Sequence, residues 1–369
     1  MEELLKGILG INGGTIFMFI IAGILIYLAI AKEYEPTLLL PIGFGAILAN
    51  IPFSNALGSD GVLSILYNAG IKTELFPVLI FIAVGAMIDF GPLLKNPFML
   101  FFGAAAQFGI FATMLVAILL GFDLPEAATI GIIGAADGPT SIVVAQKLAA
   151  GLIAPITVAA YSYMALVPII QPPVVKLLTT KNERLIRMEY TEVKVPKSVK
   201  LLFPIVVTIL AGLIAPSSVA LVGFLMFGNL IRECGVLERL SKSAQNELAN
   251  LVTILLGITI GSTMVAEEFL KPRTLLIIGL GLVAFIFDTA GGVIFAKILN
   301  LFLKNKINPM IGAAGISAFP MSARVIQQMA TKEDPSNFII AQSISANVAG
   351  QLGSIVAGGM ILALVPTFM

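Results

Sequence analysis

The sequence predicts an all-α, polytopic membrane protein built from two inverted-topology repeats, and three observations carry that prediction. Of its 369 residues, 58% are hydrophobic and only 12% are charged, which lies outside the range of water-soluble domains. Several uncharged runs are long enough to cross a bilayer as helices. Two further apolar segments, 127–147 and 308–329, are interrupted by glycine and proline, as in the re-entrant or broken helices of transporters.

Composition also excludes several functional classes. A formal net charge of +1 argues against nucleic acid as a partner. The chain contains no histidine, so it has neither a histidine-dependent catalytic triad nor an imidazole metal site. Its one cysteine, Cys234, cannot form an internal disulfide. The N-terminal Met-Glu-Glu lacks the basic region of a cleaved signal peptide, so we expect the first span to be retained.

The N-terminal membrane half, residues 1–175, contains the first set of uncharged runs. These runs lie at 7–31, 36–59, 76–88, 98–120 and 148–175. Pro41 and Pro52 predict a shorter, irregular second crossing. Residues 60–74 mix polar and apolar side chains and are expected at the surface. Residues 98–120 predict the most regular helix of the chain, with Gln107 as its one amide.

A basic connector, residues 176–200, divides the chain almost in half. It carries seven cationic side chains against three glutamates: Lys176, Lys181, Arg184, Arg187, Lys194, Lys197 and Lys200. The positive-inside rule therefore places it in the cytoplasm. The C-terminal membrane half, 201–369, is expected to form two short helices with a turn at 216–218, and further spans at 248–266, 275–303 and 335–369.

Asp137 is the most informative residue. It lies in a run, 127–146, that contains no other charge, and it is flanked by Gly134, Gly138 and Pro139, which interrupt helices. A carboxylate on interrupted backbone at membrane depth is tolerated where it lines a polar cavity, so we interpret it as a cation or proton site. The alternative is an interfacial loop that happens to hold an acid.

The two halves repeat one another. Residues 133–136 have the sequence Ile-Gly-Ala-Ala, which recurs at 311–314, and Leu-Lys-Asn-Pro at 94–97 is echoed by Leu-Lys-Pro at 270–272. The topology keeps the connector inside only if both interrupted segments enter the membrane and return, from opposite sides. The sequence therefore predicts an inverted repeat whose interrupted segments meet near the midplane and form an ion site there.

The repeat nominates polar residues for the second half of that site: Asn308, Ser317, Ser322, Arg324, Asn347 and Gln351. Each serine, asparagine or glutamine alone also suits plain helix packing. Arg324 needs an anionic partner or water, which favours binding of an anionic ligand. Asp288 fits a second ion or proton site, or a hydrogen bond to a neighbouring helix. Tyr161 and Tyr163 are ordinary helix residues, or one of them relays a proton.

Four stretches carry a resemblance to a known family. They are residues 31–36, 134–140, 160–173 and 308–324, the last beginning with Asn-Pro and ending with Ser-Ala-Arg. Together they resemble the beta subunit of the sodium-pumping, biotin-dependent decarboxylases, and the resemblance extends over nearly the whole chain. Ala135 departs from the glycine of many members.

The resemblance implies a membrane subunit that decarboxylates carboxybiotin, consumes a proton and exports sodium across the inner (cytoplasmic) membrane. It assigns sodium to Asp137, Asn308, Gly312, Ser317 and Asn347. It assigns catalysis to Asp137, Tyr163 and Arg324, the last two on the carboxybiotin and proton side. Oxygen ligands suit a hard cation, and the planar fork of arginine suits a carboxylate.

The same resemblance implies partners and a motion. The partners are a carboxyltransferase alpha subunit, a biotin carrier subunit, a small membrane gamma or delta subunit, membrane lipid and further copies of the chain in a homotrimer. The motion is an elevator-like displacement of the site-bearing domain. The acyl substrate would be chosen by the carboxyltransferase. Two other classes fit the residues: a sodium-coupled secondary transporter of a small solute, and a structural membrane scaffold.

Overall fold

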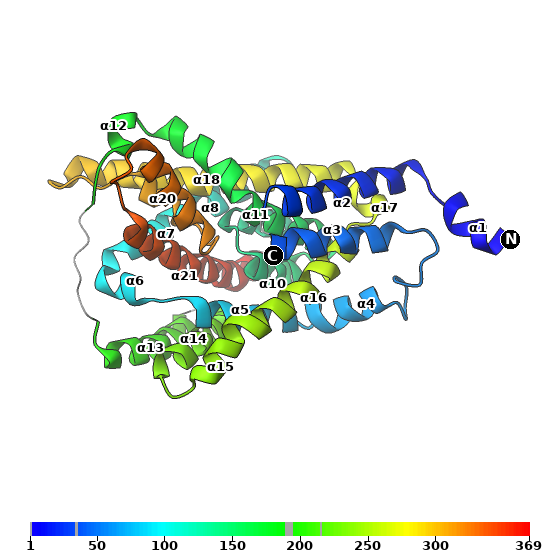
Figure 1. Ribbon diagram of the computed structural model, residues 1–369, viewed down its shortest axis with the longest axis horizontal. Coiled ribbons are helices and arrows are strands. Elements are labelled where there is room, and N and C mark those ends of the chain that lie inside the picture. Colours follow the sequence, from blue (N-terminus) through cyan, green and yellow to red (C-terminus); the bar gives the residue numbers. More distant parts are fainter. Residues whose placement is uncertain (1, 34–35, 189–194, 215) are drawn as a thin grey trace.

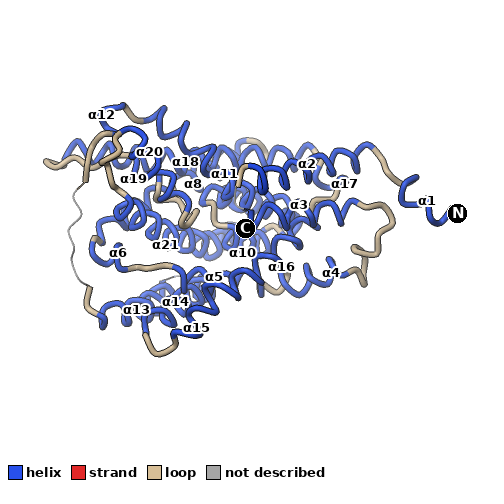
Figure 2. Tube along the Cα trace, viewed as in Figure 1, coloured by secondary structure: helices blue, strands red, loops and turns tan. Residues whose placement is uncertain are grey.

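The computed structural model describes residues 2–33, 36–188, 195–214 and 216–369 (Figure 1). Within these ranges every regular element is a helix, as Figure 2 shows. Six helices are long and apolar enough to cross a membrane, and a bent pair adds a seventh candidate. The prediction of an all-α, multi-pass membrane protein is therefore confirmed.

The first half forms short and long helices in alternation. Its elements are α1 (Glu2–Leu9), α2 (Gly13–Ala31), α3 (Pro36–Asn50), α4 (Val62–Leu66), the π-helix η1 (Tyr67–Ile71), α5 (Leu75–Met87), α6 (Gly91–Lys95), η2 (Pro97–Met99), α7 (Leu100–Ala106), α8 (Phe108–Leu119), α9 (Leu124–Gly131), η3 (Ile132–Ala135), α10 (Gly138–Leu148), η4 (Ala150–Leu152) and α11 (Ile153–Leu178). The short α12 (Lys181–Arg184) follows in the connector.

The second half is also helical throughout its described residues. It comprises α13 (Lys197–Ile214), η5 (Pro216–Ser218), α14 (Val219–Cys234), α15 (Glu238–Ser243), the π-helix η6 (Ala244–Leu248), α16 (Ala249–Ser262), α17 (Ala266–Phe269), α18 (Pro272–Phe302), α19 (Met310–Ala313), α20 (Met321–Glu333), α21 (Ile340–Leu364) and η7 (Val365–Phe368). The turn predicted at 216–218 is present as η5 between α13 and α14. The connector residues 189–194 lie outside the described ranges.

One expectation about local structure holds in part and one was wrong. Residues 60–74, expected at the surface, form α4 and η1 and make a bent pair with α5 at an angle of 61°. Val62 and Ile65 are exposed, as a surface segment requires, whereas Leu63 and Ile71 are buried. Residues 98–120 do not form one regular helix, because a turn at Gln107 separates α7 from α8. A carboxylate far away in sequence stabilises this turn, as described below.

Helices of the two halves cross one another at two close contacts. A Cβ atom on Gly261 of α16 would lie 2.1 Å from the carbonyl oxygen of Ile42 in α3. A Cβ atom on Gly228 of α14 would lie 2.0 Å from the carbonyl oxygen of Ile82 in α5. Both crossings require glycine because the backbones touch. Each therefore joins a helix of one half tightly to a helix of the other.

Asparagine side chains reinforce both crossings in the same manner. The Asn50 amide donates to the Met264 carbonyl at 2.6 Å, just beyond the end of α16. The Asn229 amide donates to the Ile88 carbonyl at 2.9 Å, just beyond the end of α5. These buried hydrogen bonds satisfy carbonyls that a helix leaves free at its C-terminus.

Helix α18 is the longest element and lies along the upper side of the molecule in Figure 1. It contacts both interrupted segments. A Cβ atom on Gly134 would meet Ala284 of α18 at 2.8 Å, and one on Gly312 would meet the Gly292 carbonyl at 2.0 Å. One continuous helix thus sets the positions of both interruptions.

Candidate functional site

Asp137 lies where the first interrupted segment changes direction. The 3-10 helix η3 ends at Ala135, the next residue, Ala136, adopts left-handed backbone angles (φ 52°, ψ 42°), and Asp137 is extended. This conformation is costly for a residue other than glycine and is found mainly at functional sites. Asp137 is the N-cap of α10, and Pro139 occupies the first turn of that helix, where proline is tolerated.

The Asp137 carboxylate is surrounded by neutral hydrogen-bond donors. Oδ1 accepts from the Thr140 amide at 3.2 Å, and Oδ2 accepts from the Thr140 hydroxyl at 2.7 Å. Oδ2 also accepts from the Ser354 hydroxyl at 2.7 Å and the Gln351 amide at 3.4 Å. The residue is only 3% exposed and forms no ion pair with any described residue. A buried negative charge without a counterion is costly, so the site is suited to a cation or a proton.

The second interrupted segment lies directly against the first. The Ser317 amide donates to the Ala135 carbonyl at 3.0 Å, and the Ser317 hydroxyl donates to the Gly350 carbonyl at 2.9 Å. The Asn347 amide donates to the Ile316 carbonyl at 2.6 Å. The structure thus brings the predicted residues Ser317 and Asn347 to the neighbourhood of Asp137.

Helix α21 presents its polar side chains to this point on one face. Asn347, Gln351 and Ser354 follow one another at spacings of four and three residues, so they lie on one side of the helix. Gln351 and Ser354 contact Asp137, and the Oδ1 atom of Asn347 is buried without a hydrogen-bond partner. A buried amide oxygen without a donor is an available ligand for a cation.

A cavity of about 290 Å³ opens beside the carboxylate. One wall carries Asp137, Tyr161, Ser317 and Gln351 from the interrupted segments and their neighbours. The opposite wall is formed by α5 and α16 together with residues of α3 and η6. The cavity has room for a small organic group next to the ion-binding oxygens.

The two tyrosines of α11 occupy different environments. Tyr161 lines the cavity, packs against Gly138 and has a buried hydroxyl without a partner. Tyr163, the tyrosine assigned by family resemblance, donates its hydroxyl to the Ile278 carbonyl of α18 and does not line the cavity. The structure therefore brings Tyr161 to the site.

Arg324 lies on α20, three residues after Met321, which lines the cavity. Its side chain is exposed and pairs with no carboxylate among the described residues. An arginine close to a cavity and without a counterion is available to an anionic ligand.

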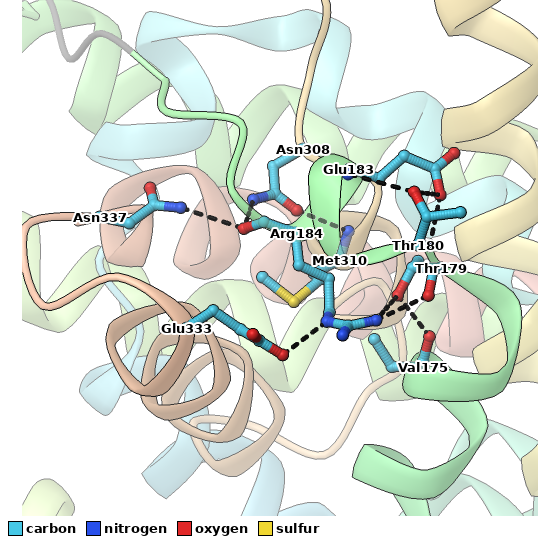
Figure 3. A network of polar contacts seen from close by, with 9 residues as sticks. All are labelled: Val175, Thr179, Thr180, Glu183, Arg184, Asn308, Met310, Glu333 and Asn337. Atoms are coloured by element: carbon cyan, nitrogen blue, oxygen red, sulfur yellow. Dashed lines mark hydrogen bonds and ion pairs between the residues drawn. The ribbon is translucent and has the colours of Figure 1, made fainter.

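Asn308 lies away from the cavity, in the network that Figure 3 shows. Its amide donates to the carbonyls of Arg184 and Ile186 at 2.9 Å each, and its Oδ1 accepts from the Met310 amide at 3.1 Å. Asn337 donates to the same two carbonyls at 3.2 and 3.3 Å. Both asparagines therefore hold the connector against the start of α19.

Ion pairs fasten the same connector segment to the end of α20. Arg184 bonds Glu333 at 2.8 Å, and Arg187 bonds Asp334 at 2.7 Å. The Ser336 amide and the Arg187 guanidinium hold the pKa of Asp334 below its usual value, because both stabilise the anion.

Two of the remaining candidates support the backbone of the interrupted segments. Gly312 packs against Gly292, so its contribution comes from the close backbone approach. The Ser322 hydroxyl donates to the Ala313 carbonyl at 3.1 Å and accepts from the Gln171 amide at 2.8 Å, which links α20 to α19 and α11. In this structure Ser322 therefore has the role of a residue that joins packed helices.

Asp288 is buried in α18, and its Oδ1 accepts from the Ile110 amide at 3.1 Å. That amide belongs to the first turn of α8, just after the interruption at Gln107, and it also donates to the Gln107 carbonyl at 3.2 Å. Asp288 thus hydrogen-bonds a neighbouring helix, which was one of its two predicted roles. The other, a second ion or proton site, stays untested.

Sequence reasoning missed Ser354 and Thr140. The Asp-x-x-Thr spacing of an N-cap could have indicated Thr140. Ser354 lies seven residues after Asn347, on the same helix face, but nothing local marks it as a partner of Asp137. His, Cys, Asp and Glu side chains form no cluster of three or more in the described ranges, so the site depends on one carboxylate and neutral oxygens.

The fold and this site together define a multi-pass membrane protein with a buried carboxylate beside a cavity, between two interrupted helical segments. Residues 14–365 match the model of a family described as the Na+-transporting oxaloacetate decarboxylase beta subunit. The chain belongs to that family.

Several curated relatives align over almost their whole length. The chain is 50% identical to the methylmalonyl-CoA decarboxylase subunit beta of Propionigenium modestum, covering 97% of this chain and 96% of the relative. It is 52% identical to the glutaconyl-CoA decarboxylase subunit beta of Acidaminococcus fermentans, covering 98% and 96%. It is 45% identical to the oxaloacetate decarboxylase beta chain of Klebsiella pneumoniae, covering 96% of each.

Proposed function

We propose that the chain decarboxylates carboxybiotin presented by a partner subunit and couples that reaction to sodium export. The observation that carries the proposal is the buried Asp137 carboxylate, which has neutral donors only and faces a cavity between two interrupted segments. The chain's membership of the Na+-transporting decarboxylase family supports the same function.

Sodium is bound by Asp137 together with neutral oxygens of the second segment and α21. The free Oδ1 of Asn347 and the Ser317 hydroxyl, which lines the cavity, support this assignment. Gly312 acts through its backbone contact with α18. Asn308 acts indirectly, by fixing the first turn of α19 to the connector.

The carboxybiotin end of the site is formed by Arg324 and a tyrosine of α11. During decarboxylation the bond between the ureido nitrogen and the carboxyl carbon breaks, carbon dioxide leaves, and the nitrogen keeps the electron pair and takes up a proton. Arg324 offers two parallel donors that match a carboxylate. The hydroxyl of Tyr161 is without a partner beside Asp137, which supports a place in proton delivery, whereas Tyr163 would first have to release the Ile278 carbonyl.

The proposal also covers the relation of the two halves, the motion of the site and the partner subunits. We propose that the two halves are inverted repeats, which is supported by the matched crossings at Gly261 and Gly228. The bundle that carries Asp137 moves against α3, α5, α14 and α16, and the position of the cavity on this boundary supports such an elevator motion. The connector faces the cytoplasm, where the carboxyltransferase and biotin carrier subunits supply the substrate. The chain forms a homotrimer, with the small membrane subunit bound to it.

Sodium and a proton compete for the Asp137 carboxylate, which provides the test. Carbon dioxide release by the purified complex is measured across a sodium titration at several pH values. The sodium concentration at half-maximal rate should rise as the pH falls, because a protonated carboxylate cannot hold the ion. Turnover without any need for sodium, or a sodium requirement that is independent of pH, would overturn the proposal.

A further inference from the structure

A second hollow, outside the site described above, lies between α11 and α20. It measures about 350 Å³ and is lined by Pro168, Pro172, Lys176, Gln328, Lys332 and Glu333, with two apolar side chains of α20. We call it the α11–α20 groove. It is rich in features that recognise an anionic, amide-bearing molecule, and nothing in the catalytic scheme uses it.

The α11–α20 groove has a net positive charge. Lys176 and Lys332 are exposed, and neither forms an ion pair with a described residue. The one carboxylate of the groove, Glu333, is already bonded to Arg184 at 2.8 Å. Two uncompensated ammonium groups therefore remain to attract an anion from solution.

Helix α20 contributes residues both to the groove and to the cavity that holds Asp137. Met321 lines that cavity, and Arg324, Gln328 and Lys332 follow on the same helix at spacings of three or four residues. Residues at these spacings lie on one face. From Met321 to Lys332 the helix rises roughly 16 Å at about 1.5 Å per residue.

Two prolines of α11 line the groove and interrupt the backbone hydrogen bonding of that helix. Pro168 and Pro172 have no amide proton, so the carbonyls of Met164 and Pro168, four residues earlier, lose their usual helical donor. Residues at this spacing share a helix face, so the freed carbonyls lie on the side of the two prolines. Such acceptors suit the N–H groups of an amide or a ureido ring.

We propose that the α11–α20 groove is the track along which a carboxylated biotinyl-lysine arm enters the site. The inference rests on the proposed function and adds the route of the substrate to it. The arm is anionic at its tip, carries amide and ureido N–H groups, and joins them through roughly a dozen bonds, which span about 14 Å when extended. Lys332 and Lys176 attract the tip, the freed carbonyls bind the N–H groups, and Arg324 receives the carboxylate.

The test compares two double variants of the intact complex. Lys176→Gln with Lys332→Gln removes both groove cations. Lys181→Gln with Lys304→Gln removes two exposed lysines outside the groove. The groove variant should raise the KM for carboxylated carrier protein about fivefold at low salt, with kcat and sodium requirement unchanged. The control should stay within about twofold of the parent, and the difference should vanish at high ionic strength.

Other results would contradict the inference. An unchanged KM in the groove variant, or an equal rise in the control, would show that the groove does not guide the arm. A loss of activity that appears only in vesicles containing anionic phospholipid, and not in zwitterionic ones, would make it a lipid site instead. Lys332→Glu provides a second check, because charge reversal should raise the KM further. If the parent complex releases no carbon dioxide from carboxylated carrier, the proposed function fails rather than the groove.

Discussion

The two interrupted segments share a backbone design and differ in chemistry. Both contain Ile-Gly-Ala-Ala, both are packed on α18 through a glycine, and both lead into a helix, α10 or α20. The first holds an acid as the N-cap of its helix, with four donors on its oxygens. The second holds no acid: it offers an amide, a hydroxyl and carbonyls, and a cation, Arg324, in the helix that follows.

Under the proposed function, this difference assigns the two segments to ligands of opposite charge. The acidic segment would provide the fixed charge that a cation requires. The second segment would complete the cation site with neutral groups, and its arginine would bind an anion. Each side of the comparison can be tested by removing the group that distinguishes it.

The largest effect is expected from Asp137→Asn, which makes the first segment as neutral as the second. Loss of a buried charge partner costs about 2–5 kcal/mol, so sodium-dependent decarboxylation should fall at least about 30-fold. The fold should persist because the shape is unchanged. Activity is measured with the purified complex, and Asp89→Asn is the matched control, since Asp89 lies far more exposed at a span end. Sodium pumping at the parental rate would contradict the assignment.

The second test removes the guanidinium group of Arg324, which follows the second interrupted segment. Arg324→Lys keeps the charge and loses the paired donors, so turnover of carboxybiotin should fall roughly tenfold. The sodium concentration at half-maximal rate should change much less, because Arg324 does not contact Asp137. A steady-state titration of both ligands measures the two effects separately. Equal losses on both sides, or no loss, would argue against a substrate role.

The smallest effects are expected when single hydroxyl groups are removed, one that bonds Asp137 and one from the second interrupted segment. Ser354→Ala removes a charge-assisted hydrogen bond to Asp137, so the carboxylate is less favoured as an anion and the sodium requirement should rise roughly threefold to tenfold. Ser317→Ala removes one neutral oxygen of the proposed sodium site but leaves the Asp137 charge, all four of its donors and the backbone contact with Ala135 in place, so its effect should be smaller. Sodium titrations of the two variants give the order, and the reverse order would break the comparison.

Sequence reasoning anticipated the parts of the molecule that depend on local chemistry. Long apolar runs predicted the membrane class, and Gly134, Gly138 and Pro139 marked the interruption around Asp137, because both effects act on adjacent residues. It failed at Gln107, where the interruption of α7 and α8 is stabilised by Asp288 at a sequence separation of 178 residues. It also did not anticipate that Leu63 and Ile71, within the surface segment 60–74, are buried, because their burial depends on tertiary contacts.

The residues of the candidate site also divide into those that the sequence indicated and those that it did not. Asp137, Ser317, Asn347 and Gln351 carried a signal because a charge or a repeat marked them. Ser354 carried none, since its role depends on the rotation of α21 against α10. Asn308 was expected at the ion, and the structure places its amide on connector carbonyls, a contact between segments more than 120 residues apart.

By itself, the sequence determined the membrane class, the interrupted segments, the buried acid and the family, because composition, periodicity and motif are properties of neighbouring residues. The tertiary structure decided which tyrosine of α11 reaches the cavity, which hydroxyls bond Asp137, and where Arg324 and the two groove lysines lie relative to one another. The physical reason is helix rotation. A turn of 100° per residue separates Tyr161 from Tyr163 by more than half a circle, and only packing against α18 and α10 fixes which of them faces the acid.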